Sequence, residues 1–235
     1  MEASVSPHVS HAMLNDGIVE ARAYQLEAVD EALSSSMLLV MPTAAGKTAV
    51  IWMMISEKLS RGGRVMMIAP TVGLVEQHIR SLREVLKLKD EIVQITGQLP
   101  PAKRVEKWDG ARLVVATPKV VVNDVSNGVV DLSDFSVLVV DEAHHCTGDH
   151  AMAQICDNYI SKNVRPHILG VTASPGHRPE AVREICKRTG AVRIHIRNSA
   201  EEMLSGYLSE LEVREITVSV PVSYTHLRAH ETVMN

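Results

Sequence analysis

Residues able to bind phosphate stand together in one run of the chain, Met37-Leu-Leu-Val-Met-Pro-Thr-Ala-Ala-Gly-Lys-Thr48. Its first five residues are apolar and predict a buried strand, and a helix is expected to begin at Thr48. Small residues between the two let backbone N–H groups close around phosphate oxygens, and the helix N-terminus adds positive potential. Lys47 can reach the β- and γ-phosphates of a nucleotide, and the Thr48 hydroxyl can bind Mg²⁺. The expected phosphate-binding residues are Met41, Pro42, Thr43, Ala44, Ala45, Gly46, Lys47 and Thr48.

Two adjacent carboxylates end a second apolar run, in the segment Val137-Leu-Val-Val-Asp-Glu-Ala-His144. In a parallel sheet ligands gather at the carboxyl ends of strands, so Asp141 is expected to face the same crevice as Lys47. Asp141 would hold Mg²⁺ through water, and Glu142 would orient and deprotonate the water that attacks the γ-phosphate. His144 would sense the nucleotide and pass its state to the next strand. The alternative is that the two carboxylates merely cap the following helix.

The elements that must position these residues are short apolar runs separated by amphipathic stretches. Buried strands are predicted at residues 37–41, 65–69, 92–95, 113–116, 137–140 and 168–171, with further strands at 192–196 and 213–220. Helices are predicted at residues 23–33, 48–59, 73–86, 101–108, 119–126, 150–160 and 179–189. Strict alternation of strand and helix predicts β-α-β units. The expected fold class is therefore α/β, a mostly parallel β-sheet with helices on both faces.

Composition limits the function classes without selecting one. Hydrophobic residues make up 46% of the 235 residues and charged residues 22%, which is an ordinary globular balance. A net charge of -4 neither supports nor excludes a nucleic-acid partner, and the 3% of aromatic residues disfavours a base-stacking platform. Three cysteines without a C-x-x-C pair suit a reducing compartment. Without a secretory signal or a membrane-length apolar run, a soluble cytoplasmic protein is expected.

Histidines and a cysteine near the second carboxylate run raise the question of a zinc site. The residues concerned are His144, His145, Cys146 and His150, and their spacing matches no common structural zinc pattern. We expect surface or packed side chains at these positions.

With these residues placed, the chain resembles the DEAH-type helicases of superfamily two. Residues 41–48 resemble motif I, although Met41 stands where the strict pattern has glycine and Ala44 where helicases usually have it. The other matching segments are Asp141-Glu-Ala-His144 for motif II, Thr172-Ala173-Ser174 for motif III, Ala69-Pro-Thr71 for motif Ia and Thr117-Pro118 for motif Ib. Their order and spacing are similar to those of the first RecA-like domain, a P-loop NTPase.

This resemblance implies ATP and Mg²⁺ as cofactors. It gives catalytic roles to Lys47, Asp141, Glu142 and His144, Mg²⁺ ligation to Thr48 and Asp141, and coupling to Thr172, Ala173 and Ser174. The segment Arg22-Ala-Tyr-Gln25 is similar to an adenine-reading element, in which the Gln25 amide pairs with adenine and Arg22 belongs to the same site. A P-loop kinase would share the Gly-Lys-Thr run but would explain neither motif II nor motif III.

Further segments resemble one branch, which contains the archaeal fork-DNA helicase-nuclease and the Fanconi-anaemia-M translocase. They are residues 96–108, 117–124 and 169–176. In that branch the loops of motifs Ia and Ib grip one strand through its phosphates, which carries little sequence information. The implied nucleic-acid track consists of Thr71, Gly73, Thr96, Gly97, Thr117 and Pro118. The expected partner is DNA, branched or duplex, and RNA sensors and Dicer helicases, which act on double-stranded RNA, are the close alternative.

The domain boundaries follow from the extent of this resemblance. Residues 1–19 are expected to be an N-terminal extension and residues 20–221 the ATP-binding domain. Residues 222–235 resemble translated sequencing adapter and are expected to be non-native. We find no arginine motif of a second RecA-like domain, so the isolated chain is expected to bind ATP with Mg²⁺ but to hydrolyse it poorly. A stand-alone nucleotide-binding module without motor activity is the alternative from another class.

Overall fold

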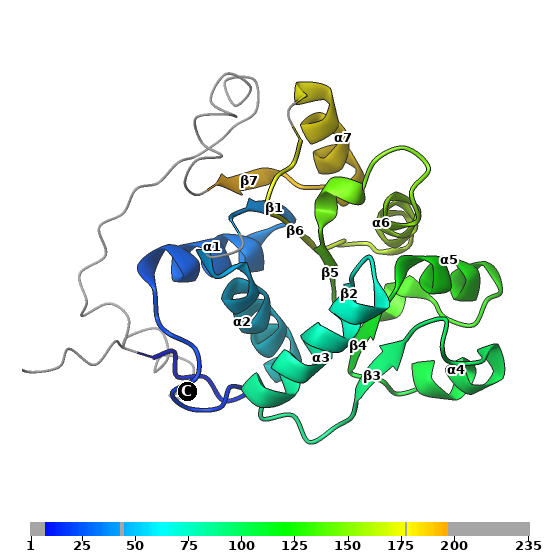
Figure 1. Cartoon of the computed structure of the whole chain (residues 1–235), viewed down its shortest axis with the longest axis horizontal. Helices are drawn as coiled ribbons and strands as arrows, with labels where there is room; N and C mark the ends of the chain where they lie inside the picture. The colour runs from blue at the N-terminus through cyan, green and yellow to red at the C-terminus, as the bar shows by residue number, and fades with distance from the viewer. Residues whose placement is uncertain (1–7, 43–44, 177, 197–235) are drawn as a thin grey trace, which may run out of the picture.

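A computed structural model describes residues 8–42, 45–176 and 178–196 (Figure 1). In this part of the chain a seven-stranded sheet has the order β3-β4-β2-β5-β6-β1-β7, and every pairing is parallel. The strands are β1 (Met37–Val40), β2 (Val65–Ile68), β3 (Ile92–Ile95), β4 (Leu113–Ala116), β5 (Val137–Asp141), β6 (Ile168–Thr172) and β7 (Arg193–Ile196). The helices are α1 (Ala23–Ser34), α2 (Lys47–Ser60), α3 (Val72–Val85), α4 (Pro101–Trp108), α5 (Pro118–Ser126), α6 (Ala151–Lys162) and α7 (Pro179–Thr189).

The predicted α/β fold is confirmed. The strands form because their Val-, Ile-, Leu- and Met-rich runs are buried on both faces, as a covered parallel sheet requires. Each of the seven strands lies within about one residue of its expected position. The eighth expected strand, residues 213–220, lies outside the described residues.

Two apolar cores lie on opposite faces of the sheet. Alternate strand residues point to opposite faces, so Met37 and Leu39 pack with α1–α3, while Leu38 and Val40 pack with α4–α7. Figure 1 shows α1–α3, coloured blue to cyan, on one side and α5–α7, green to yellow, on the other. This packing leaves the carboxyl ends of the strands as the edge where loops can carry chemistry.

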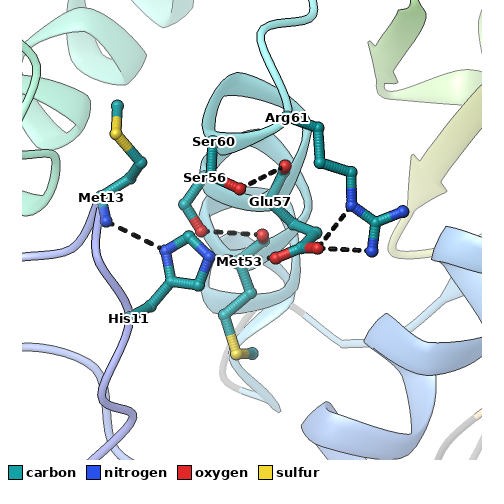
Figure 2. Close-up of polar contacts among 7 residues, drawn as sticks. All are labelled: His11, Met13, Met53, Ser56, Glu57, Ser60 and Arg61. Carbon is teal, nitrogen blue, oxygen red and sulfur yellow. Dashed lines mark hydrogen bonds and ion pairs between the residues drawn. The ribbon is translucent and has the colours of Figure 1, made fainter. Parts of the chain in front are cut away.

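The segment before α1 packs against this domain. Leu14 and Val19 are 1% and 2% exposed and join the core beneath α1–α3. The Met13 N–H donates to His11 Nδ1 at 3.1 Å, which leaves Nε2 to donate to Glu57 Oε2 of α2 at 3.0 Å (Figure 2). The expected N-terminal extension thus contributes core residues from its described part. In the described residues, no helix has the length and apolar character needed to cross a membrane.

Candidate active site

The phosphate loop joins the end of β1 to the start of α2. Gly46 is its conformational pivot, with φ 82° and ψ 36° in the left-handed region that favours glycine. A Cβ added at Gly46 would lie 2.1 Å from Gln25 Nε2, so the Gln25 amide would have to move away from the loop to admit a side chain. Lys47 and Thr48 begin α2 directly after this pivot, where a helix N-terminus favours phosphate. The expected loop residues Thr43 and Ala44 lie outside the described residues.

Two side chains of α1 hold the loop in place. The Tyr24 hydroxyl donates to the Ala45 carbonyl at 3.0 Å, and Gln25 Nε2 donates to the carbonyls of Ala45 at 3.3 Å and Gly46 at 3.4 Å. Gln25 is buried, with 3% exposed. Arg22 is exposed, contacts the Tyr24 hydroxyl at 3.2 Å and pairs with Glu20 at 2.7 Å, and these hydrogen bonds raise the pKa of its guanidinium. The expected adenine-reading element therefore lies against the phosphate loop.

The second carboxylate run ends β5, close to the phosphate loop. Strand β6 alone separates β5 from β1, and the Met41 N–H donates to the Thr172 carbonyl at 3.1 Å. Asp141 Oδ1 accepts the Glu142 N–H at 3.0 Å, and Oδ2 lies 2.7 Å from Nε2 of His78, on α3. The side chains of His78 and Asp141 are each 10% exposed. Asp141 is thus fixed by two donors from different parts of the chain.

Glu142 combines a carboxylate with an unusual backbone. Its φ of 55° and ψ of 48° are left-handed, and no other non-glycine residue among those described has a positive φ. Such a conformation stores about 1–3 kcal/mol and persists only where the surroundings impose it. Strain of this kind concentrates at functional sites, which agrees with the expected role of Glu142 as the base.

A chain of polar contacts connects Glu142 to the end of β6. The Thr172 hydroxyl donates to the Ser174 carbonyl at 2.9 Å, so its oxygen is left to accept from His144 Nδ1 at 3.1 Å. The same Nδ1 lies 3.2 Å from Glu142 Oε2. Both neighbours are acceptors, which assigns the proton to Nδ1. The structure therefore brings the expected sensor His144 together with two members of motif III, Thr172 and Ser174.

The six residues expected to contact nucleic acid differ in exposure. Thr71 and Gly73, at the start of α3, and Gly97, after β3, are exposed. Thr96, Thr117 and Pro118 are buried, and the Thr117 N–H donates to the Ile95 carbonyl at 3.0 Å. The backbone of Thr117 therefore connects the loop after β4 to the end of β3, while Thr71, Gly73 and Gly97 face solvent.

A buried ion pair braces the same two loops. Arg104 of α4 forms two hydrogen bonds to Asp124 of α5, at 2.8 and 2.7 Å, and Trp108 Nε1 donates to the same carboxylate at 2.9 Å. Arg104 also donates to the Leu99 carbonyl at 2.7 Å, in the loop after Gly97. Burial alone would raise the pKa of Asp124, but the hydrogen bonds from Arg104 and Trp108 and the charge of Arg104 outweigh it and hold that pKa below its usual value.

The histidines after β5 pack against one another. His145 and His150 stack with ring centroids 5.0 Å apart, and burial is the main cause that lowers the pKa of both, with a further contribution from neighbouring basic side chains. Cys146 Sγ lies 3.8 Å from Cys156 Sγ in the core. No cluster of three or more metal-ligating side chains occurs in the described part of the chain.

Comparison with known proteins decides the family. Residues 22–182 match the family model described as DEAD/DEAH box helicase. The chain belongs to this helicase family. A Methanocaldococcus jannaschii protein, named provisionally as an ATP-dependent RNA helicase, is 36% identical over 215 residues, 91% of this chain and 27% of that protein. The DEAD-box ATP-dependent DNA helicase Fancm of Drosophila melanogaster is 32% identical over 206 residues, 85% of this chain and 14% of that protein.

A solved structure supports the same placement. The Pyrococcus furiosus Hef helicase domain matches with a TM-score of 0.75 and 35% identity, over 80% of this chain and 41% of that one. The expected first RecA-like domain of a superfamily-two helicase, similar to the Hef and Fanconi-anaemia-M branch, is thereby confirmed. The helicase chain spans 14% to 27% of the length of the two curated relatives.

The helicase chain carries oxygen ligands of the kind that Mg²⁺ prefers. A carboxylate offers about four lone-pair sites, and the contacts from His78 and Glu142 use two of those on Asp141. The remaining sites and the Thr48 hydroxyl supply the hard oxygen donors that Mg²⁺ binds directly or through water. Asp141 and Thr48 therefore fit the metal expected for this family.

Sequence reasoning missed two residues of this site. Tyr24 lies inside the Arg22–Gln25 element, so its position was visible, but its contact with Ala45 was not. His78 has no local signal beyond its place on the buried face of α3, because its partner Asp141 is 63 residues away.

Proposed function

We propose that this chain is the ATP-binding domain of an ATP-dependent DNA helicase or translocase, with residues 20–221 as that domain. Within it, ATP and Mg²⁺ bind at the carboxyl ends of β1 and β5. The observation that carries the proposal is the meeting of three groups at one sheet edge: Gly46-Lys47, Asp141-Glu142, and the His144–Thr172 hydrogen bond. A nucleotide-binding fold without chemistry would not need a strained carboxylate beside a phosphate loop.

The roles of the side chains follow from their chemistry. Lys47 neutralises the β- and γ-phosphates, and Asp141 and Thr48 hold Mg²⁺, which supplies further charge neutralisation when bound. Glu142 accepts a proton from the water that attacks the γ-phosphate, while Gln25 and Arg22 select adenine. His144 then connects Glu142 to Thr172, so that a change at the nucleotide reaches Ala173 and Ser174 in motif III.

The nucleic-acid partner is proposed to be DNA, held through its phosphates. The exposed positions Thr71, Gly73 and Gly97 and the backbone of the loop at Thr96 and Thr117-Pro118 form the track. Two relatives, from Drosophila melanogaster and Schizosaccharomyces pombe, are named as ATP-dependent DNA helicases, which favours DNA. The name of the M. jannaschii relative favours RNA as the second candidate. Competition of unlabelled branched DNA, duplex DNA and duplex RNA for a labelled DNA fork separates the two.

The 235-residue chain, purified by itself, is proposed to bind ATP but to hydrolyse it slowly. It contains no Gln-x-x-Gly-Arg-x-x-Arg segment, and an arginine supplied to the transition state is worth about 10³–10⁵ in rate. Strong unwinding of duplex DNA by this chain alone would contradict the proposal.

Binding of a fluorescent ATP analogue, with and without Mg²⁺, tests the proposed function. The chain should bind the analogue, ATP should displace it better than GTP, and Lys47→Ala should weaken binding at least about tenfold through loss of a charged phosphate contact. Lys58→Ala, on the same helix and outside the loop, is the matched control. Equal binding by the chain and Lys47→Ala would exclude the phosphate loop as the ATP site.

A further inference from the structure

His78 lies on a helix that connects the two proposed binding regions. Helix α3 begins at its N-cap Thr71, whose hydroxyl accepts the Leu74 N–H at 3.2 Å, and its first turn includes Gly73. His78 follows two turns later, on the buried face with Val75 and Ile79. At 1.5 Å per residue, about 10 Å of helix separate Thr71 from His78. A rigid helix thus has exposed track positions at one end and a buried imidazole farther along.

The imidazole contacts the carboxylate expected to hold Mg²⁺. The distance between His78 Nε2 and Asp141 Oδ2 is 2.7 Å, and both side chains are nearly inaccessible to solvent. The other oxygen, Oδ1, is held by the Glu142 N–H, which is fixed to β5 itself. The contact from α3 is therefore the one that can change when α3 moves relative to the sheet.

A carboxylate held by two donors has a defined orientation. The hydrogen bond that Nε2 donates to Oδ2 fixes the rotation of the Asp141 side chain and directs its remaining lone pairs. Partners of this kind, which touch a ligand and not the metal, commonly change metal affinity about 10- to 100-fold when they are replaced.

We propose that His78 is a positioning residue that orients Asp141 for Mg²⁺ and couples nucleic acid at the start of α3 to the nucleotide. The inference rests on the proposed function, because it requires ATP·Mg²⁺ at Asp141 and nucleic acid at Thr71 and Gly73. Coupling is reciprocal, so ATP·Mg²⁺ changes the affinity for DNA by the same factor as DNA changes the affinity for ATP·Mg²⁺.

Two amide variants isolate the hydrogen bond from packing. His78→Gln places an amide nitrogen where Nε2 lies, whereas His78→Asn, one methylene shorter, does not reach Asp141. The Mg²⁺ concentration for half-maximal binding of the fluorescent ATP analogue should rise about 10- to 100-fold in His78→Asn and remain within about threefold of the parent chain in His78→Gln. Binding of the analogue without Mg²⁺ should be the same in the parent chain and in both His78 variants. Arg83→Ala, exposed on α3, is the control.

The same variants test the coupling. DNA affinity, measured by fluorescence anisotropy with and without ATP·Mg²⁺, should change with nucleotide in the parent chain and in His78→Gln, and should lose most of that change in His78→Asn. Thermal unfolding confirms that each variant is folded. If His78→Asn is unfolded, His78→Ala is measured in its place.

Three results would overturn the inference. Equal Mg²⁺ dependence in the parent chain and the Asn or Ala variant removes the positioning role. Equal defects in the Gln and Asn variants show a packing role instead. DNA affinity that is insensitive to nucleotide in the parent chain removes the coupling. Failure of the proposed function is distinct, because the parent chain would then bind no analogue or bind it unchanged by Lys47→Ala.

Discussion

Glu142 and Gly46 are adjacent to the proposed chemistry, and both adopt left-handed backbone conformations. In Gly46 this conformation is inexpensive, because the residue has no Cβ. In Glu142 the same conformation is costly, because the residue has a Cβ, and a glycine would adopt it with less strain. A carboxylate at that position is the feature that the strain preserves.

Replacement of Glu142 by Gln should separate binding from hydrolysis. The amide has nearly the same shape but accepts no proton, and general-base catalysis contributes about 10²–10⁴ in rate. We expect single-turnover ATP hydrolysis to fall at least about 100-fold in Glu142→Gln, with analogue binding within about threefold of the parent chain. Hydrolysis at the parental rate would assign the proton to another acceptor.

Replacement of Gly46 by Ala should weaken nucleotide binding at the phosphate loop. An alanine at this position would be strained by the left-handed backbone conformation. Its methyl group would also lie 2.1 Å from Gln25 Nε2. Gly110→Ala is the matched control, because Gly110 has φ 67° and no atom within 4 Å of an added Cβ. Both variants should lose about 1–2 kcal/mol of unfolding free energy to the backbone term. Only Gly46→Ala should also weaken analogue binding tenfold or more, and equal binding in the two variants would contradict the role of the close contact.

Helices α4 and α5 illustrate how an element positions loops that it does not contain. The Arg104–Asp124 pair, with Trp108, holds the two helices together behind the loops at Gly97 and Thr117. A buried polar contact between the two helices therefore sets the positions of both loops. On the opposite face, α1 and α3 act similarly through Tyr24 and His78.

Replacement of Asp124 by Asn, which removes the buried partner of Arg104, should destabilise the domain far more than loss of an exposed carboxylate that also pairs with α4. Asp124 has 3% of its side chain exposed, and leaving Arg104 buried without its partner costs about 3–5 kcal/mol. Glu91, paired with Lys107 of α4, is exposed, so Glu91→Gln should change stability by less than about 1 kcal/mol. Urea unfolding of Asp124→Asn and Glu91→Gln measures the loss of stability in each variant. Similar values would show that the Arg104 pair is replaceable.

The lowered pKa of Asp124 gives this difference a pH dependence. A carboxyl group whose folded pKa lies below its unfolded value contributes stability above the unfolded pKa and loses it as pH falls through the folded pKa. The ordinary value is 3.8, so the contribution is fully present near neutral pH and declines below about pH 4. The difference in unfolding free energy between the parent chain and Asp124→Asn should therefore shrink in acid. A difference that stays constant from pH 7 to pH 3 would contradict this.

Sequence patterns predicted the strands and most of the site because both are local. Apolar runs of four or five residues define β1 to β6, and Lys47, Asp141 and Thr172 each follow or end such a run. Contacts between distant elements were not predictable in this way. The partnership of His78 with Asp141, and the burial of Thr96, depend on how helices pack over the sheet.

At the scale of the whole molecule, the folded domain begins before the segment that the family match covers. The family match begins at residue 22, and the sequence predicts an extension before residue 20. Yet Leu14 pairs with Leu86 after α3, and the Lys87 N–H donates to the Met13 carbonyl at 2.9 Å. The segment before α1 therefore packs against the end of α3 and covers part of the core under α1–α3.

Truncation of Leu14 tests whether this segment belongs to the cooperative domain. Leu14 is 1% exposed within the core, so Leu14→Ala should lower the free energy of unfolding by about 2–5 kcal/mol. Ile18, four residues later and 44% exposed, is the matched control, and Ile18→Ala should stay within about 0.5 kcal/mol. A single unfolding transition with these two effects would place the start of the helicase domain before residue 14. Equal, small effects would instead mean that the domain folds without the segment and that its contacts with α2 and α3 are incidental.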